Sequence, residues 1–193
     1  AQSLQVPGVS GLPNNTVMFE FSEHDDPEVL TECVDSALFA ASTRKTLLVL
    51  RHGDFHFGEK KRIHIWLTWN DQHNANSMIL LAYVLLGHPD WAKAEISVYA
   101  ALPKDQVETR KEDFKELITE GRLPVSEKNV RFLSVDDVES FRRLVARLSG
   151  DADLVLVGFN VGGLQTRREA VFSNHPSLRD VLFVHAPREI VIE

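Results

Sequence analysis

The histidines and aspartate of "RHGDFHFG" are the first residues whose types could do chemistry. His52, Asp54 and His56 are all groups that bind transition metals. Their spacing would place them on one side of a helix, but Gly53 and Gly58 indicate a loop. A solvated linker explains the stretch better, and we predict no metal site here.

A polar turn, "WNDQHNAN" at residues 69–76, follows the apolar run "IHIWLTW" and precedes a helical pattern. In α/β folds, ligand-binding side chains lie at this kind of strand-to-helix junction. Asn70 and Asp71 could accept hydrogen bonds from a ribose or a substrate hydroxyl, with His73 as a nearby base. The alternative, which the residue types favour, is that Asn70 and Asp71 cap the helix and turn the chain.

A glycine-rich stretch, "VGFNVGGLQTRRE" at residues 157–169, also follows a predicted strand. Gly158, Gly162 and Gly163 could let backbone amides approach a phosphate, and Arg167 and Arg168 add positive charge. The spacing does not match G-x-G-x-x-G, and the chain contains no G-x-x-x-x-G-K-[ST]. A tight loop without a ligand is the alternative that this spacing favours.

Nucleophile motifs are absent from the sequence. There is no G-x-S-x-G, and the single cysteine, Cys33, falls in the middle of a predicted helix, where a structural thiol is expected. A small hydrolase that uses His73 and Asp71 is the least favoured hypothesis. We therefore predict that the chain is not an enzyme.

The elements that position these residues alternate between short apolar runs and amphipathic stretches from Arg62 onward, which is typical of βαβ units. The runs occupy residues 63–69, 94–102, 129–135, 153–159 and 180–186. We predict a parallel five-stranded sheet in the order 3-2-1-4-5, with right-handed crossovers and helices on both faces. This order would bring the 70–73 turn beside the 158–163 loop.

Three helices are predicted between these strands. The first begins at Asn74 or Asn76, contains "MILLAYVLL" and stops at "GHP"; nine apolar residues are too few to span a bilayer. Because it is apolar on all sides, it must be covered by the N-terminal segment or by a second subunit. The others cover about residues 104–121 and 137–149, with Arg142, Arg143 and Arg147 on the outside of the latter.

Residues 17–51 form a separate βαβ unit whose helix runs from Pro27 to about Thr43. The segment "HGDFHFGEKK" behind it resembles a boundary. We predict two regions, residues 1–57 and 58–193. The first should have its own short sheet and pack on the second through apolar surface.

Composition narrows the class of protein. The chain has 193 residues, of which 44% are hydrophobic and 25% charged, as in globular domains. Its formal net charge of -7 argues against a nucleic-acid partner. The lone Cys33 fits a reducing compartment, and "AQSLQVPGVSGLPNN" lacks the features of a signal peptide.

"IHIWLTWNDQHNANSMILLAYVLLGHPDWAKAEISVYAAL" resembles the second half of the C-terminal cytoplasmic domain of cation-chloride cotransporters. That family has a strand like IDVWWL, an acidic turn, an apolar helix like LLLPYLL, a tryptophan and a strand like KIRVF, in this order. "GLPNNTVMFEF" and "TLLVLRHGDF" resemble the closing βαβ of the family's first half. Only "HFGEKK" joins the two parts, as in a compact, prokaryotic-like relative, and no transport domain is present.

The resemblance implies a fold similar to universal stress proteins, a homodimer, and a non-catalytic regulatory role beside a transmembrane transport domain, on the cytoplasmic side of the cell membrane. The alternative is a nucleotide-binding sensor, because some universal stress proteins bind ATP. The residues at the matching places, a candidate ATP or ADP pocket, are Asn70, Asp71, Gly158, Gly162, Gly163 and Arg167. The glycine spacing is one residue too long, and no G-[ST] follows, so we expect no cofactor to be required.

Overall fold

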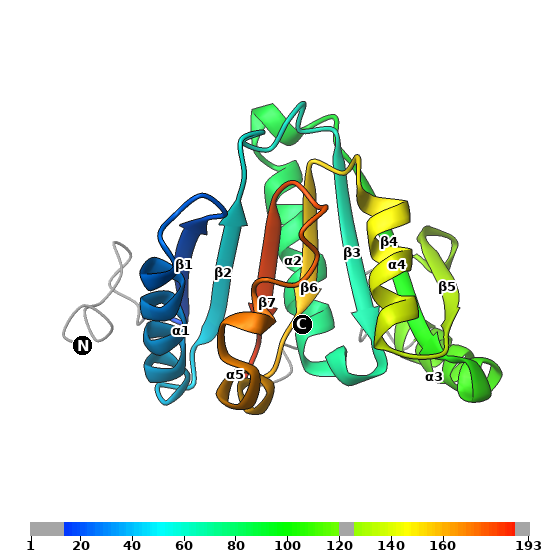
Figure 1. Ribbon diagram of the computed structural model, residues 1–193. Coiled ribbons are helices and arrows are strands. Elements are labelled where there is room, and N and C mark those ends of the chain that lie inside the picture. Colours follow the sequence, from blue (N-terminus) through cyan, green and yellow to red (C-terminus); the bar gives the residue numbers. More distant parts are fainter. Residues whose placement is uncertain (1–13, 120–125, 188–193) are drawn as a thin grey trace.

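Seven strands form one sheet in the computed structural model, which describes residues 14–119 and 126–187 (Figure 1). The sheet order is β1-β2-β7-β6-β3-β4-β5. Neighbouring strands are parallel except β2 and β7, which are antiparallel. The strand bounds are β1 Thr16–Ser22, β2 Thr46–His52, β3 Arg62–Thr68, β4 Glu95–Pro103, β5 Val130–Val135, β6 Leu154–Gly158 and β7 Val181–His185.

Helices cover both faces of the sheet. α1, α4 and α5 lie over the face that points forward in Figure 1, and α2 and α3 lie behind it. Each face therefore has its own hydrophobic core, one centred on Trp66 and Phe172 and the other on Ile65 and Met78. The helix bounds are α1 Pro27–Ala41, α2 Gln72–Leu86, α3 Val107–Thr119, α4 Val138–Ser149 and α5 Val161–Arg167.

The burial of the strands follows their place in the sheet. Successive residues of β2, β3, β6 and β7 are buried, because these inner strands have a covered face on both sides. β1 lies at one edge, and its exposed residues alternate with half-buried ones and with the buried Phe21. β5, at the other edge, is likewise mixed, with only Val130 buried. The runs of Val, Leu and Ile in the sequence are thus explained by two-sided packing.

The predicted five-stranded order is confirmed for residues 62–186, where β5-β4-β3-β6-β7 corresponds to 3-2-1-4-5. The prediction of a separate N-terminal sheet is wrong. β2 pairs with β7, from Leu47 opposite His185 to Arg51 opposite Val181, so β1 and β2 extend the main sheet. The reason is that β7 would otherwise be an open edge with two apolar faces, and β2 pairs with it and buries it.

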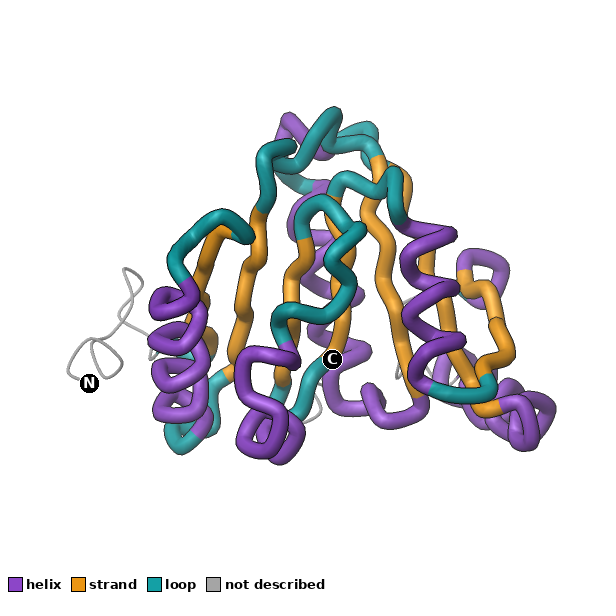
Figure 2. The backbone as a smooth tube through the Cα atoms, in the orientation of Figure 1, coloured by secondary structure: helices purple, strands orange, loops and turns teal. Residues whose placement is uncertain are grey.

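The connection from β2 to β3 is more tightly held than a solvated linker. It passes over the top of the sheet in Figure 2 and is anchored by two buried carboxylates. Asp180 accepts hydrogen bonds from the backbone N–H groups of Gly53 (3.1 Å) and Phe57 (2.6 Å). Asp153 accepts from three more, those of residues 59, 61 and 62, at 2.8 to 3.1 Å. The side chains of residues 54–56 do remain exposed, as expected of a linker.

Helix ends agree with the sequence at some positions and differ at others. α2 begins at Gln72, two residues before Asn74, so neither Asn74 nor Asn76 is its N-cap, although Gly87 does end it. α4 begins as predicted, with Asp137 and Ser140 forming a reciprocal capping box. None of the helices within the described ranges combines the length and apolar character needed to cross a bilayer.

α2 keeps an exposed apolar strip despite its buried neighbours. Leu80, Tyr83 and Val84 are 38, 44 and 64% exposed, and Met18 on β1 is 53% exposed. An apolar groove runs between Met18 and Val84. Its lining includes Leu48, Leu50 and Leu81. We call these four exposed residues, Met18, Leu80, Tyr83 and Val84, the α2 surface. The N-terminal unit therefore covers α2 only in part.

Candidate functional site

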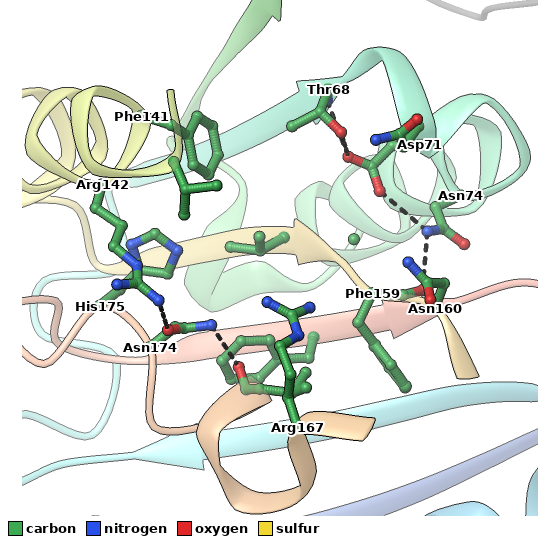
Figure 3. A pocket seen from close by; sticks show the side chains of 16 residues that line it. Thr68, Asp71, Asn74, Phe141, Arg142, Phe159, Asn160, Arg167, Asn174 and His175 are labelled. Carbon is green, nitrogen blue, oxygen red and sulfur yellow. Dashed lines mark hydrogen bonds between the residues drawn. The ribbon is translucent and has the colours of Figure 1, made fainter. Parts of the chain in front are cut away.

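The polar turn after β3 and the segment after β6 meet at one end of the sheet, as predicted. β3 and β6 are parallel neighbours, and the helices that follow them lie on opposite faces, so their carboxyl ends diverge around a crevice. The side-chain amide of Asn74 donates to the carbonyl oxygen of Phe159 across this crevice (3.2 Å). A cavity of about 250 Å³ opens here (Figure 3).

Asp71 is buried in the wall of this pocket and is fully engaged by its neighbours. Its carboxylate accepts from the backbone N–H and hydroxyl of Thr68 (2.9 and 2.5 Å) and from Asn74 Nδ2 (3.1 Å). Burial raises the pKa of Asp71, and these hydrogen bonds oppose the rise. The carboxylate therefore fixes the β3–α2 turn, as the structural alternative expected, but it makes no capping hydrogen bond to the backbone of α2. Asn70 lines the same pocket.

The three glycines of the 158–163 segment have different roles. A Cβ on Gly158 would lie 1.8 Å from Asp71 Oδ1, so only glycine lets β6 approach the β3–α2 turn so closely. Gly162 and Gly163 are not loop residues, because they lie in the first turn of α5. The side chain of Asn160 accepts from Gly163 N (2.6 Å) as the N-cap of that helix. Of the three, Gly158 lines the pocket.

Asn74 is a bridging residue that sequence reasoning placed at a helix end. Its side-chain oxygen accepts from the backbone N–H of Ala186 (2.9 Å), while its nitrogen donates to Asp71 and Phe159. One 5% exposed side chain thus joins the ends of β3, β6 and β7. Its signal in the sequence is weak, since Asn74 stands in a run of polar residues that all suit a cap.

The two arginines at the end of α5, Arg167 and Arg168, point in different directions. Arg167 lines the pocket, as predicted, and its side chain points into it in Figure 3. Arg168 turns away and forms a salt bridge with Asp35 of α1 (2.7 Å). Of these two arginines, only Arg167 contributes charge to the pocket.

Three further pocket residues escaped the sequence analysis, because they come from elements far from the two motifs. Arg142 of α4 was expected on the outer face, but it lines the pocket and donates to Asn174 Oδ1 (2.7 Å). It lies one helical turn after Val138 and directly after Phe141, which could have signalled an inward position. Asn174 and His175 belong to the segment before β7.

Arg51 holds this segment in place from the neighbouring strand β2. It is 4% exposed and donates to the carbonyl oxygens of Asn174 (2.8 Å), His175 (2.8 Å) and Leu178 (3.3 Å). Burial lowers the pKa of Arg51, while the charges of Glu23 and Asp180 raise it. A buried cation with carbonyl partners fixes the backbone that presents Asn174 and His175 to the pocket.

His175 is neutral in this setting. It is 7% exposed, and burial together with the charges of Arg51 and Arg142 lowers its pKa from 6.5 to about 4. Its ring packs edge-to-face on Phe141, with 5.9 Å between centroids. Its Nδ1 atom is buried without a hydrogen-bond partner in the described structure.

The histidines of the β2–β3 connection do not gather around a common point. His52 and His56 stack loosely, with ring centroids 6.1 Å apart, and Asp54 pairs with His24 (3.0 Å). Within the described residues, no group of three or more His, Cys, Asp and Glu side chains could hold a metal ion. The pocket at β3 and β6 is therefore the candidate functional site.

Comparisons with known proteins support the fold. No family model and no curated protein sequence matches this chain. Among solved structures, the cytoplasmic domain of a prokaryotic cation chloride cotransporter aligns with 98% of this chain and 69% of its own, at 17% identity and a TM-score of 0.61.

Two Pseudomonas aeruginosa proteins are also similar, and each aligns with 88% of this chain and 62% of its own. A protein of unknown function from strain PAO1 has 18% identity and a TM-score of 0.52. A candidate universal stress protein from strain UCBPP-PA14 has 20% identity and a TM-score of 0.53. This chain thus spans about two thirds of each neighbour. The expected resemblance to the cotransporter domain and to universal stress proteins is confirmed at the level of fold.

Proposed function

We propose that this chain is a non-catalytic regulatory and dimerisation domain of a membrane cation-chloride cotransporter, on the cytoplasmic side of the membrane. The observation that carries the proposal is the alignment of nearly the whole chain with the cytoplasmic domain of such a protein. A transmembrane transport domain, encoded in the same polypeptide, would be its partner. Ion transport would be the activity that it regulates.

The environment of the candidate acid and base favours a role without catalysis. The oxygens of Asp71 are bonded to Thr68 and Asn74, whereas His73 is exposed. A general base must reach the proton that it removes, and a triad-like pair needs direct contact between its members. Asp71 and His73 therefore make a poor catalytic pair.

The α2 surface supports self-association with a second copy of this chain. It joins a helix and the edge strand β1, and it borders an apolar groove. Its large aliphatic and aromatic side chains are typical of interface centres. A two-fold dimer would bury this strip against itself, and stable interfaces bury about 1,200 to 2,000 Å² in total.

Sedimentation of Val84→Glu over a wide concentration range tests the dimer. A charge at the centre of the α2 surface should weaken the dimer by at least about tenfold in Kd. Phe39→Glu is a matched control, because Phe39 is 55% exposed against 64% for Val84 but lies on α1, on the opposite face of the sheet. A wild-type protein that is monomeric throughout, or two variants that behave alike, would contradict the dimer.

The coding sequence around this domain tests the transporter assignment. We expect about a dozen apolar segments, each near 20 residues, in the same reading frame. If they are present, Val84→Glu in the full-length protein should change ion flux, and Phe39→Glu should not. A reading frame without membrane spans would overturn the assignment.

A nucleotide-binding sensor is the second candidate. It is favoured by the pocket that Asn70, Asp71, Gly158 and Arg167 line at the β3–β6 crevice. A thermal-shift measurement with ATP and ADP separates the two functions. A shift that Arg167→Gln abolishes would favour the sensor.

A further inference from the structure

The pocket between α4 and α5 contains more positive charge than its protein partners neutralise. Arg142 and Arg167 line it from different helices, and the buried Arg51 lies behind its wall at residues 174 and 175 (Figure 3). Two guanidinium groups therefore line one small cavity, and a third, beside the charges of Glu23 and Asp180, lies behind its wall. Each is always charged at physiological pH.

The carboxylates of the protein leave much of this charge uncompensated. One guanidinium nitrogen of Arg142 forms a salt bridge with the exposed Glu139 (2.8 Å). The other donates a hydrogen bond to the neutral side chain of Asn174. Within the described part of the chain, Arg167 forms no salt bridge. Asp71 is the carboxylate in the pocket wall, and Thr68 and Asn74 already occupy it.

The surroundings of His175 also show an excess of positive charge. It is more than nine-tenths buried, lines the pocket and has an unpartnered Nδ1 atom. The positive charges of Arg51 and Arg142 add to burial in lowering its pKa to about 4. An anion beside Arg142 would reverse part of this effect, because it would favour the protonated ring.

The shape of the cavity limits what could bind. Its volume is about 250 Å³, below the roughly 300 to 1,000 Å³ of pockets for drug-sized ligands. Val157, Phe159 and Phe183 contribute apolar surface, and Asn160 and Asn174 contribute amides. A small anion with a short apolar or hydroxylated body fits this lining, whereas a whole nucleoside triphosphate exceeds it.

We propose that Arg142 and Arg167 bind a small oxyanion, a phosphate or carboxylate group, in this pocket. The planar fork of a guanidinium matches both groups with paired hydrogen bonds, and chloride offers no such geometry. The physiological meaning of this site rests on the proposed regulatory function, since the oxyanion would be the signal that the domain senses. Its binding chemistry does not depend on dimerisation.

Calorimetric titration of the full chain at constant ionic strength tests the proposal, with inorganic phosphate, succinate, chloride and ATP as probes. We expect saturable binding of phosphate or succinate, and the tighter of the two identifies the chemical source. Arg142→Gln and Arg167→Gln should each weaken it by at least about tenfold, the effect of losing one charged hydrogen bond. Arg143→Gln, an exposed neighbour outside the pocket, should keep the wild-type affinity.

A nuclear magnetic resonance titration of the His175 ring provides a second readout that a purely structural arginine would not change. The saturating oxyanion should raise the His175 pKa in the wild type and not in Arg142→Gln. The proposal is overturned if neither oxyanion binds saturably, if chloride competes equally at matched ionic strength, or if Arg143→Gln weakens binding as much as Arg142→Gln. Loss of oxyanion binding with an intact dimer would refute this inference alone, and loss of the dimer with intact binding would refute the dimerisation alone.

Discussion

Replacing Asp180 by asparagine should destabilise the protein through the β2–β3 connection. Asp180 is 0% exposed and accepts from Gly53 and Phe57, and its charge also favours the buried Arg51. Asparagine keeps the shape, but it loses the charge and turns one acceptor into a donor that faces a backbone N–H. Each charge-assisted hydrogen bond contributes about 1.5 to 3 kcal/mol, and asparagine retains one neutral bond. We therefore expect the free energy of unfolding to fall by about 3 kcal/mol.

The backbone conformation of the β2–β3 connection indicates where the effect of Asp180→Asn should be seen. His56, Phe57 and Lys60 have positive φ angles of 43, 66 and 55°, a region that non-glycine residues adopt only when held. Freed from Asp180, residues 53–57 should relax and exchange their amide hydrogens faster. Urea unfolding measures the free energy of unfolding, and amide hydrogen exchange shows which residues become less protected.

Asp151→Asn is the matched control for this variant. Asp151 also lies beside the connection and pairs with Arg62, but its side chain is 66% exposed, so its loss should cost less than about 1 kcal/mol. Equal stabilities for the two variants would refute the reasoning. So would an unchanged exchange rate at residues 53–57 in Asp180→Asn.

Three further outcomes are expected. Deleting residues 1–57 should cause aggregation, measured by light scattering, because it opens the β7 edge and uncovers residues such as Phe183; an equally soluble truncated protein would contradict this. Since the pKa of His175 is lowered to about 4, its contribution to stability is complete above pH 6.5 and is lost as the pH falls toward 4, by up to about 3 kcal/mol. Asparagine tolerates the φ of 62° at this position, so His175→Asn should make the urea-derived stability depend less on pH between 6.5 and about 4. An equally steep dependence would argue against His175 as the titrating group. Burial raises the pKa of Cys33 to about 11, so a thiol-reactive dye should label it slowly until urea unfolds the chain, and rapid native labelling would be inconsistent.

Much of the sheet could be predicted from the sequence because its inner strands are buried on both faces. Apolar runs such as 153–159 and 180–186 are short, rich in Val and Leu, and bounded by polar residues, which identifies strands without any partner information. The partner of β2 could not be predicted in this way. The run "TLLVL" would have the same composition beside a parallel or an antiparallel neighbour, so its pairing with β7 depends on which open edge lies nearby.

The candidate site was predictable for residues at strand ends and for Arg167, which the sequence places shortly after the glycine-rich stretch. Asn70 and Asp71 follow β3 and Gly158 ends β6, and parallel neighbours place such residues together. Arg142 and His175 come from other elements, and their approach depends on how α4 and the 173–180 segment pack over the sheet. The anchors of the β2–β3 connection were hidden for a similar reason, since Asp180 is 123 residues from the Phe57 amide that it binds.

The continuous pairing of β2 with β7 also decides how motion could travel through this molecule. Two units on separate sheets could rotate about the segment between them, but here five residue pairs of an antiparallel ladder join them, and Arg51 lies on that ladder. We therefore expect the seven strands to move as one rigid body, without a hinge between β2 and β3. A force applied at β1 would reach the pocket segment at residues 174–178 as a rigid-body displacement, through Arg51 and its carbonyl contacts.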